Sequence, residues 1–434
     1  MHAAHDDRGC VSPVTRVLVI GAGAAGSMAA IFAAKAGAEV VLIERTRDGG
    51  RKILVSGGGR CNVLPAHLDE SRFVTDSSSN LLRKMIRSWP LAEQRAFFEV
   101  TLGIPLVEEV ESAKLFPASH KARDVRDGLL AHARDAGVVL RMEARVTAVA
   151  RAETGWHLSI EGCEPLSGDA VIIATGGLSV PATGSDGLGL DVLASLGHTM
   201  HPTYAALTPL TAPATAFTAL AGVSLRVALA ATDGARRAEA AGGMLFTHIG
   251  YSGPSVLDVS HVAVRSRTGG SVPARVLVQW TPLGDAEWSA ALAPQGARTV
   301  TGALRAALPD RLAAVLLAQA GVEATRTLSE LRRDERLRLI EVLVRGVLPW
   351  SGDEGYKKAE VTGGGMALEE VNPRTMESRR HPGLFICGEV LDAFGPIGGY
   401  NFLWAWATGV VMPISRLCLP PSLYIYFHFA CEVN

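Results

Sequence analysis

The stretch RVLVIGAGAAGSMAAIFAAKAGAEVVLIER, residues 16–45, decides the fold. An apolar run, a glycine-rich turn, a helix of small residues and a second apolar run predict a β–α–β unit. The turn carries Gly21, Gly23 and Gly26 in the spacing GxGxxG. These glycines allow a tight turn, the approach of backbone to a pyrophosphate, and close packing of the helix on the strand. The first N–H groups and the positive end of the helix would then bind phosphate.

Glu44 supplies the second half of a dinucleotide signal. It ends the second apolar run about 20 residues after the glycines, where an acid typically binds an adenosine ribose hydroxyl. GxGxxG alone is weak because glycine-rich turns are common. With the strand, the helix and Glu44 around it, the motif predicts dinucleotide binding, and we expect Ala24, Ala25 and Arg45 at the same site.

Composition limits the possible partners and the compartment. The 434 residues fit two or three domains, and 42 basic against 43 acidic side chains give a net charge of −1. This balance provides no general field for nucleic acid or an anionic membrane. No apolar run resembles a signal peptide or a membrane span. The six scattered cysteines show no zinc spacing, so we expect no metal and a cytoplasmic location. From the charge and the absence of apolar runs, we expect neither nucleic acid nor membrane as partner.

The order of strand-like and helix-like segments along the chain predicts an interrupted α/β domain. Helices are expected at 80–101 and 123–136, and strands in residues 138–150, 156–162 and 169–177. After His201 the sequence predicts short strands of alternating polarity, followed by helices. Near residue 350 the glycine-rich α/β pattern returns. The domain prediction is a disordered leader at 1–14, a dinucleotide-binding Rossmann-like domain at 15–200 and 350–412, a β-plus-helix insert at 201–349, and an atypical tail, poorly ordered or loosely packed, at 413–434.

The glycine-rich stretch GGRKILVSGGGRCNV, residues 49–63, has three interpretations. It is a flexible linker, a metal site with one thiolate, or a loop against a flat cofactor. Two later segments resemble elements of large flavoproteins: ATGGLSVPATGSDG at 174–187 and GLFICGEVLDAFGPIGGYNFLWAWATG at 383–409. This resemblance favours a flavin over a nicotinamide, and with it the third interpretation. In the second segment, Glu389 would face the ribityl–pyrophosphate region, and the N–H groups of Gly399–Asn401 would face the pyrimidine edge of the flavin. A solvated loop acid remains the alternative for Glu389.

Three long motifs resemble one family of bacterial FAD-dependent flavoproteins, which includes aminoacetone oxidase and the BaiN-like NAD(P)/FAD-dependent oxidoreductases. They are GRKILVSGGGRCN (50–62), LFTHIGYSGPSVLD (245–258) and AEVTGGGMALEEVNPRTMESRRHPGLFICGEVLDAFGPIGGYN (359–401). The resemblance covers about Arg16 to Gly409 and departs from the family in the apolar tail that begins near Val410, which resembles a frameshift or an alternative terminus.

The resemblance implies a three-layer Rossmann-like domain with a parallel sheet, interrupted by a β-barrel-like and helical insert. It also implies that the glycine loop lies over the flavin, where Cβ atoms would clash. Arg51 and Lys52 would lie near the phosphates or the flavin edge, and Asn62 would fix the loop. The further residues expected at FAD are Ser56, Gly57, Gly58, Gly59, Arg60, Val146, Thr175, Gly176, Gly177, Gly388, Gly398 and Tyr400.

The expected activity is hydride transfer between a small amine-type or enone-type substrate and flavin N5. Either O₂ or NAD(P)H would be the redox partner, and the sequence favours neither. A non-catalytic flavin-binding protein that acts through its insert is the alternative from another class. Catalytic candidates are His248, at the expected start of an insert helix, Tyr251 and Tyr400. Cys61 lacks a nearby partner cysteine, so a packing thiol is favoured over a redox thiol.

Overall fold

The computed structural model describes residues 15–214, 217–267 and 272–410 and divides them into two compact units. The first unit contains the described residues up to Gly177, then Ala182–His201, and the chain from Gly364 onward. The second contains Leu178–Pro181 and Pro202–Gly363. The expected leader, at residues 1–14, and the expected tail, at 413–434, lie outside the described residues.

A five-stranded parallel sheet organises the first unit. Its strand order is β20–β10–β1–β2–β6, with β20 at Leu384–Ile386, β10 at Ala170–Ile173, β1 at Arg16–Ile20, β2 at Glu39–Ile43 and β6 at Val139–Arg141. The three central strands are almost entirely buried, as is usual for parallel strands covered on both faces. The Rossmann-type α/β class expected from the sequence is confirmed.

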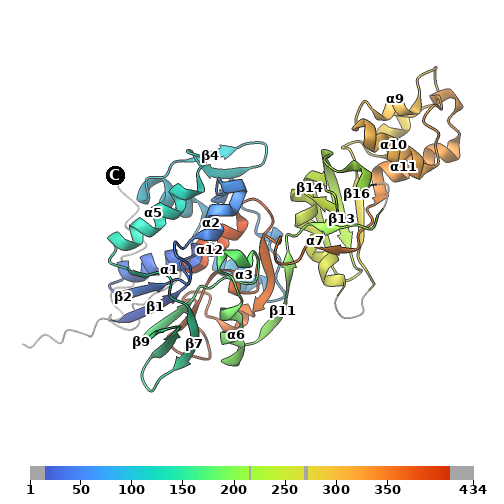
Figure 1. The fold of residues 1–434 in the computed structure, drawn as a ribbon. Coiled ribbons are helices and arrows are strands. Elements are labelled where there is room, and N and C mark those ends of the chain that lie inside the picture. Colours follow the sequence, from blue (N-terminus) through green and yellow to red (C-terminus); the bar gives the residue numbers. More distant parts are fainter. Residues whose placement is uncertain (1–14, 215–216, 268–271, 411–434) are drawn as a thin grey trace, which may run out of the picture. The chain divides into compact units, whose positions relative to one another are not determined.

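The sheet lies between helices and a smaller antiparallel sheet. Helices α1 (Ala24–Lys35) and α5 (Ala122–Asp135) lie on one side. On the other side are β7 (Val146–Arg151), β8 (Trp156–Ile160) and β9 (Cys163–Gly168) (Figure 1). A Cβ at Gly168 would lie 2.8 Å from Cγ of Leu18, so β9 packs closely under the parallel sheet.

The first unit also contains shorter helices and a second small antiparallel sheet. The helices are α2 (Arg51–Val55), α3 (Ser79–Arg87), α4 (Leu91–Ala96), α6 (Leu188–Ser195) and α12 (Tyr400–Val410). A three-stranded sheet contains β3 (Leu64–Pro65), β5 (Lys114–Pro117) and β4 (Leu106–Glu109).

Two expected elements of this unit are each divided in two. The helix expected at 80–101 is interrupted because Pro90 lacks an N–H donor and precedes α4 in an extended conformation, with ψ 149°. The strand expected at 138–150 is split between β6 and β7, which belong to different sheets, and Glu143 between them has a positive φ of 54°.

The second unit is built on a seven-stranded antiparallel sheet of order β17–β16–β13–β14–β15–β12–β18. The strands are β12 (Leu210–Thr211), β13 (Ser224–Thr232), β14 (Arg237–Phe246), β15 (Gly250–Ser252), β16 (Arg275–Gln279), β17 (Gly346–Val347) and β18 (Gly352–Asp353). Helix α7 (Pro254–Ser266) packs on β13 and β14, over a core in which Phe246 stacks on Trp280 with ring centroids 6.1 Å apart.

Helices follow the sheet of the second unit: α8 (Asp285–Ala291), α9 (Val300–Leu304), α10 (Asp310–Ala320) and α11 (Arg333–Arg345). Leu312, Leu316, Leu339 and Leu343 are buried between α10 and α11. The strands β11 (Met200–Ala206) and β19 (Val361–Met366) form a separate pair where the chain passes between the units. No helix of the described residues is long and apolar enough to cross a membrane.

Candidate functional site

Four strands of the parallel sheet end at one edge, and each is followed by a motif that the sequence singled out. Gly21 follows β1, Glu44 follows β2, Thr175 lies shortly after β10, and Gly388 lies shortly after β20. Because the strands are parallel, their carboxyl ends share this edge, which is the usual ligand position in open α/β sheets. The structure therefore brings together segments separated by more than 300 residues in sequence.

The glycine-rich turn is shaped for close backbone approach. A Cβ at Gly21 would lie 2.6 Å from the Ala174 carbonyl oxygen, and a Cβ at Gly26 would lie 1.8 Å from that of Gly21. A Cβ at Gly23 would meet nothing within 4 Å, so space remains in front of this residue. Helix α1 begins there without a side-chain cap and without an acid in its first turn. Its first N–H groups therefore suit a pyrophosphate, and the site fits the dinucleotide cofactor.

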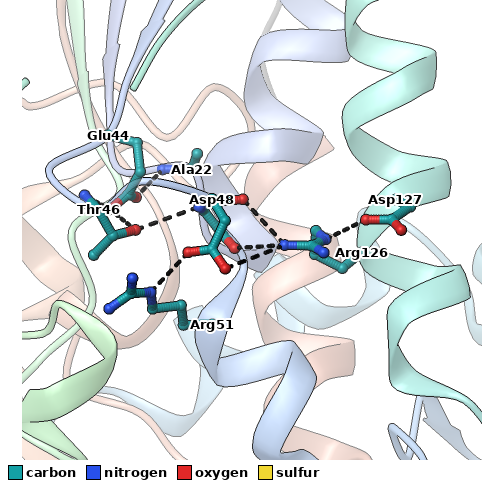
Figure 2. A network of polar contacts seen from close by, with 8 residues as sticks. Ala22, Glu44, Thr46, Asp48, Arg51, Arg126 and Asp127 are labelled. Carbon is teal, nitrogen blue, oxygen red and sulfur yellow. Dashed lines mark hydrogen bonds and ion pairs between the residues drawn. The ribbon is translucent and has the colours of Figure 1, made fainter. Parts of the chain in front are cut away.

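Glu44 is buried and links the glycine-rich turn to the segment after β2 (Figure 2). Its Oε2 accepts from the Ala22 N–H at 2.9 Å. Its Oε1 accepts from the N–H and the hydroxyl of Thr46 at 2.8 and 2.7 Å. An ionised carboxylate has about four acceptor positions. One position on Oε2 is left by these bonds, which matches one ribose hydroxyl.

The turn after Glu44 is held by an arginine that the sequence interpretation missed. The side chain of Arg126, on α5, is 9% exposed, and its Nη1 donates to the carbonyls of Asp48 and Gly49 at 3.2 and 3.5 Å. The available signal was an arginine next to the apolar stripe of α5, which contains Val125, Leu129 and Ala133. Figure 2 shows Arg126 between this turn and Asp127.

The triple-glycine loop has a backbone that only glycine adopts readily. Gly57, Gly58 and Gly59 have φ values of 55°, 68° and 84°. A Cβ at Gly57 would lie 3.1 Å from the Asn62 nitrogen and 3.2 Å from Cε1 of Phe116, whereas one at Gly58 would meet no protein atom. The loop thus packs on one side and is open at its centre. This geometry favours the cofactor-facing interpretation over a flexible linker.

Two side chains anchor the triple-glycine loop to other motifs. Arg60 pairs with Glu109 at 3.0 Å, and its guanidinium lies 4.3 Å from the centroid of the Phe116 ring. Asn62, with its amide oriented to satisfy both groups, donates to Leu64 O at 3.2 Å and accepts from the Gly399 N–H at 3.0 Å. Asn62 therefore joins the SGGGRCN motif to the GGYN motif.

Other charged candidates are paired near the same edge. Lys52 Nζ lies 2.7 Å from Glu389 Oε2, and both side chains are partly buried. Arg51 pairs with Asp48 at 2.8 Å, and Arg45 pairs with Asp186. A Cβ at Gly176 would lie 3.9 Å from Glu389 Oε2, which places the segment after β10 beside this carboxylate.

The remaining expected cofactor residues border these segments. Ser56 donates through its hydroxyl to Ile53 O at 2.7 Å, and Val146 begins β7 as a buried residue. The nearby Ala144 N–H donates to Glu44 O at 2.9 Å, so this segment follows the end of β2. A Cβ at Gly399 would lie 2.4 Å from the Leu64 carbonyl carbon, and Asn401 bonds both the N–H and the carbonyl of Gly395 at 2.9 Å.

Helix α12 fixes the loop after β20 by hydrogen bonds that sequence reasoning did not foresee. Thr408 Oγ1 accepts from the Gly388 N–H at 3.0 Å, and Trp404 Nε1 donates to the Gly388 carbonyl at 3.1 Å. Trp406 Nε1 donates to Val63 O at 3.0 Å, immediately after SGGGRCN. Two tryptophans and a threonine within five residues of a buried helix were the available signal, because buried polar groups need partners.

The three catalytic candidates differ in how free they are to react. Tyr400 is 5% exposed, and its hydroxyl donates to His67 O and accepts from the Asp69 N–H, both at 3.3 Å. Tyr251 is 1% exposed, donates to Pro349 O at 2.8 Å, and has its pKa raised by burial. His248 is exposed and lies in the turn before β15, whereas the helix expected to begin beside it, α7, starts at Pro254.

Cys61 is a buried structural thiol in this arrangement. It is 0% exposed, and burial raises the pKa of the thiol to about 12. A protonated, inaccessible thiol is a poor nucleophile and a poor metal ligand. Among the described residues, no group of three or more His, Cys, Asp or Glu side chains is arranged to hold a metal ion.

The chain resembles known proteins over most of its length. The model of the HI0933-like protein Rossmann domain matches residues 15–413. The chain is 33% identical over 409 residues to a ribosomal RNA dihydrouridine synthase of Escherichia coli, covering 90% of this chain and 95% of that protein. It is 32% identical over 405 residues to a 3-dehydro-bile acid delta(4,6)-reductase of Clostridium scindens, covering 91% and 97%.

A solved 3-ketosteroid-delta4-(5alpha)-dehydrogenase of Rhodococcus jostii is a more distant match. It is 16% identical with a TM-score of 0.44, and the match covers 93% of this chain and 98% of that one. This likeness is too distant to bear on activity. The family match spans all of the described residues, and so includes the glycine-rich turn, Glu44 and the loops at the sheet edge. The chain therefore belongs to the HI0933-like Rossmann-domain family of FAD-dependent oxidoreductases.

Proposed function

We propose that the protein is a reductase that adds a hydride and a proton across a carbon–carbon double bond conjugated to a carbonyl. The observation that carries this proposal is the chemistry shared by the names of two relatives aligned over nine-tenths of the chain. Dihydrouridine differs from uridine by two hydrogens across a ring double bond that is conjugated to a carbonyl. A delta(4,6) 3-oxo bile acid also contains carbon–carbon double bonds conjugated to a carbonyl.

The reaction places a hydride on the alkene carbon distal to the carbonyl and a proton on the carbon adjacent to it. Bound FAD supplies hydride transfer at ring N5, and NAD(P)H supplies the electrons. The proposed roles of the protein are binding and orientation. The first N–H groups of α1 would bind the pyrophosphate, Glu44 would bind a ribose hydroxyl, and Lys52 with Glu389 would lie beside the ribityl chain.

His248 is our candidate for the proton donor. Its ring is exposed and it lies in the LFTHIGYSGPSVLD motif, whereas the hydroxyls of Tyr251 and Tyr400 are engaged with backbone groups. Replacing His248 with asparagine keeps a polar side chain but removes the imidazole ring. We expect NADPH to bleach the flavin of H248N at the wild-type rate. We expect the alkene to reoxidise the bleached flavin of H248N roughly 100-fold more slowly than that of the wild type, the usual scale for losing a general acid. Wild-type rates of H248N in both half-reactions would exclude His248 as the proton donor.

Anaerobic flavin spectroscopy tests the proposed reaction. NADPH or NADH is expected to bleach the flavin, and an α,β-unsaturated ketone is expected to restore the oxidised spectrum, with the saturated ketone as product. The corresponding saturated ketone serves as a control and must leave the bleached flavin unchanged. Bleaching by a small amine without NAD(P)H would instead show an amine oxidase and would contradict the proposal.

The uracil ring of RNA is a second candidate substrate. Two relatives carry the ribosomal RNA name, and residues 202–363 contain 17 basic against 14 acidic side chains, although the whole chain has a net charge of −1. A ribosomal RNA transcript added to the bleached enzyme distinguishes the candidates. Reoxidation by the transcript, with dihydrouridine in the nucleosides released from it, would show RNA as substrate. Reoxidation only by the ketone favours a small molecule.

A further inference from the structure

Arg126 lies outside the motifs that carry the family resemblance, but it contacts the turn that presents Glu44. Its guanidinium donates to two consecutive carbonyls, those of Asp48 and Gly49, and lies 3.8 Å from Asp48 Oδ2. Its Nε bonds Asp127 on the same helix. A side chain 9% exposed that carries a full charge is costly to bury unless such partners are present.

The aliphatic part of Arg126 fixes the same turn by packing. A Cβ at Gly50 would lie 2.5 Å from Cγ of Arg126, so the arginine stem occupies the space beside this glycine. Gly49 and Gly50 have φ values of 61° and 59°, a conformation that other residues rarely adopt. The turn therefore has a backbone conformation that suits glycine, and the stem of Arg126 packs against it at Gly50.

The turn also closes a ring of hydrogen bonds with the glycine-rich loop. The Gly50 N–H donates to Ala22 O at 2.8 Å, and the Gly49 N–H donates to Thr46 Oγ1 at 3.3 Å. Thr46 Oγ1 donates to Glu44 Oε1 at 2.7 Å, and Glu44 Oε2 accepts from the Ala22 N–H. A displacement of the turn would thus change the position of the Glu44 carboxylate (Figure 2).

We propose that Arg126 is a positioning residue for FAD, which holds the 46–50 turn so that Glu44 is aligned for the adenosine ribose. Arg126 does not contact the cofactor in this proposal, because its donors are directed to Asp48, Gly49 and Asp127. It sets the affinity for FAD through Glu44. This role concerns cofactor loading and holds whichever substrate the enzyme reduces.

The test compares Arg126→Met with Arg123→Met. Arg123 lies on the same helix but is exposed, so it controls for loss of one arginine from α5. We expect R126M to weaken FAD binding to the apoprotein by roughly ten- to hundredfold, the scale of losing hydrogen bonds from a charged group. R123M is expected to bind FAD as the wild type does. FAD affinity is measured by quenching of flavin fluorescence and does not require turnover.

A mutant cycle with Glu44→Ala separates positioning from a general loss of structure. If Arg126 acts through Glu44, R126M in the E44A background weakens FAD by less than about threefold, since coupled neighbours are not additive. A full additional loss in that background overturns the proposal. If R126M does not fold, R126K decides, because lysine keeps the charge but has a shorter side chain and no Nε–H to bond Asp127. R126K should weaken FAD in the wild-type background and not in the E44A background; unchanged FAD affinity in the wild-type background overturns the proposal.

Discussion

Replacing Thr408 with valine tests whether α12 holds the loop after β20. Valine keeps the shape of threonine but removes the hydroxyl that accepts from the Gly388 N–H at 3.0 Å. Thr408 is 0% exposed, and water cannot easily replace the lost acceptor. A buried donor left without a partner costs about 1–3 kcal/mol. The same hydroxyl donates to Trp404 O. That carbonyl lies within α12, so the loss of this second hydrogen bond should cost less.

We expect T408V to release flavin at a temperature several degrees lower than the wild type, since about 1 kcal/mol shifts the melting of a domain of this size by roughly 2–4 °C. The assay follows free flavin fluorescence during heating. Thr408→Ser is the matched control, because it keeps the hydroxyl and removes one methyl group. If T408V released flavin at the wild-type temperature while T408S released it earlier, packing and not the Gly388 hydrogen bond would stabilise the loop.

Three other predictions follow from the site and the core. Glu44→Ala removes the carboxylate that accepts from Ala22 and Thr46, and we expect FAD affinity to fall roughly ten- to hundredfold, measured by fluorescence titration; unchanged affinity would refute the ribose assignment. Gly58→Val places a β-branched residue at φ 68°, a strain of about 1–2 kcal/mol, and we expect loss of flavin from the purified protein with unchanged helicity by circular dichroism. Burial lowers the pKa of His198 below its ordinary value, so the stability it contributes is present above about pH 6.5 and is lost as pH falls below it. His198→Gln should therefore flatten the fall of melting temperature between about pH 6.5 and 5, and an unchanged slope would assign it to other groups.

Much of the parallel sheet could be predicted from local pattern. The apolar runs before Gly21 and Glu44 and before the ATGG segment are short and continuous, which is typical of strands buried on both faces. The order of glycines and acid defines a β–α–β unit, and topology then places the other motifs at the same edge. The interruption of the 80–101 helix was also readable, because Pro90 disfavours helix at its own position and at the residue before it.

Long-range hydrogen bonds could not be predicted in the same way. Arg126 bonds carbonyls 77 and 78 residues away, and no local pattern says which carbonyls an arginine will reach. The hydroxyls of Tyr251 and Tyr400 looked available in sequence, but each donates to a carbonyl that is distant along the chain. A residue type defines which hydrogen bonds a side chain is able to make, whereas the tertiary structure decides which donors and acceptors stay available for a ligand.

The composition of α12 is constrained by the loops that it contacts. Its one catalytic candidate, Tyr400, has an engaged hydroxyl. The indole groups of Trp404 and Trp406 fill the core, and their N–H groups need acceptors once buried. Those acceptors are Gly388 O and Val63 O, which lie in the two loops expected at the flavin. Gly409 completes the fit, because a Cβ there would lie 2.7 Å from Ala25 O in the first turn of α1. The helix thus connects these two loops to the helix expected to bind the pyrophosphate. Changes in its apolar side chains should therefore affect cofactor retention before they affect the sheet.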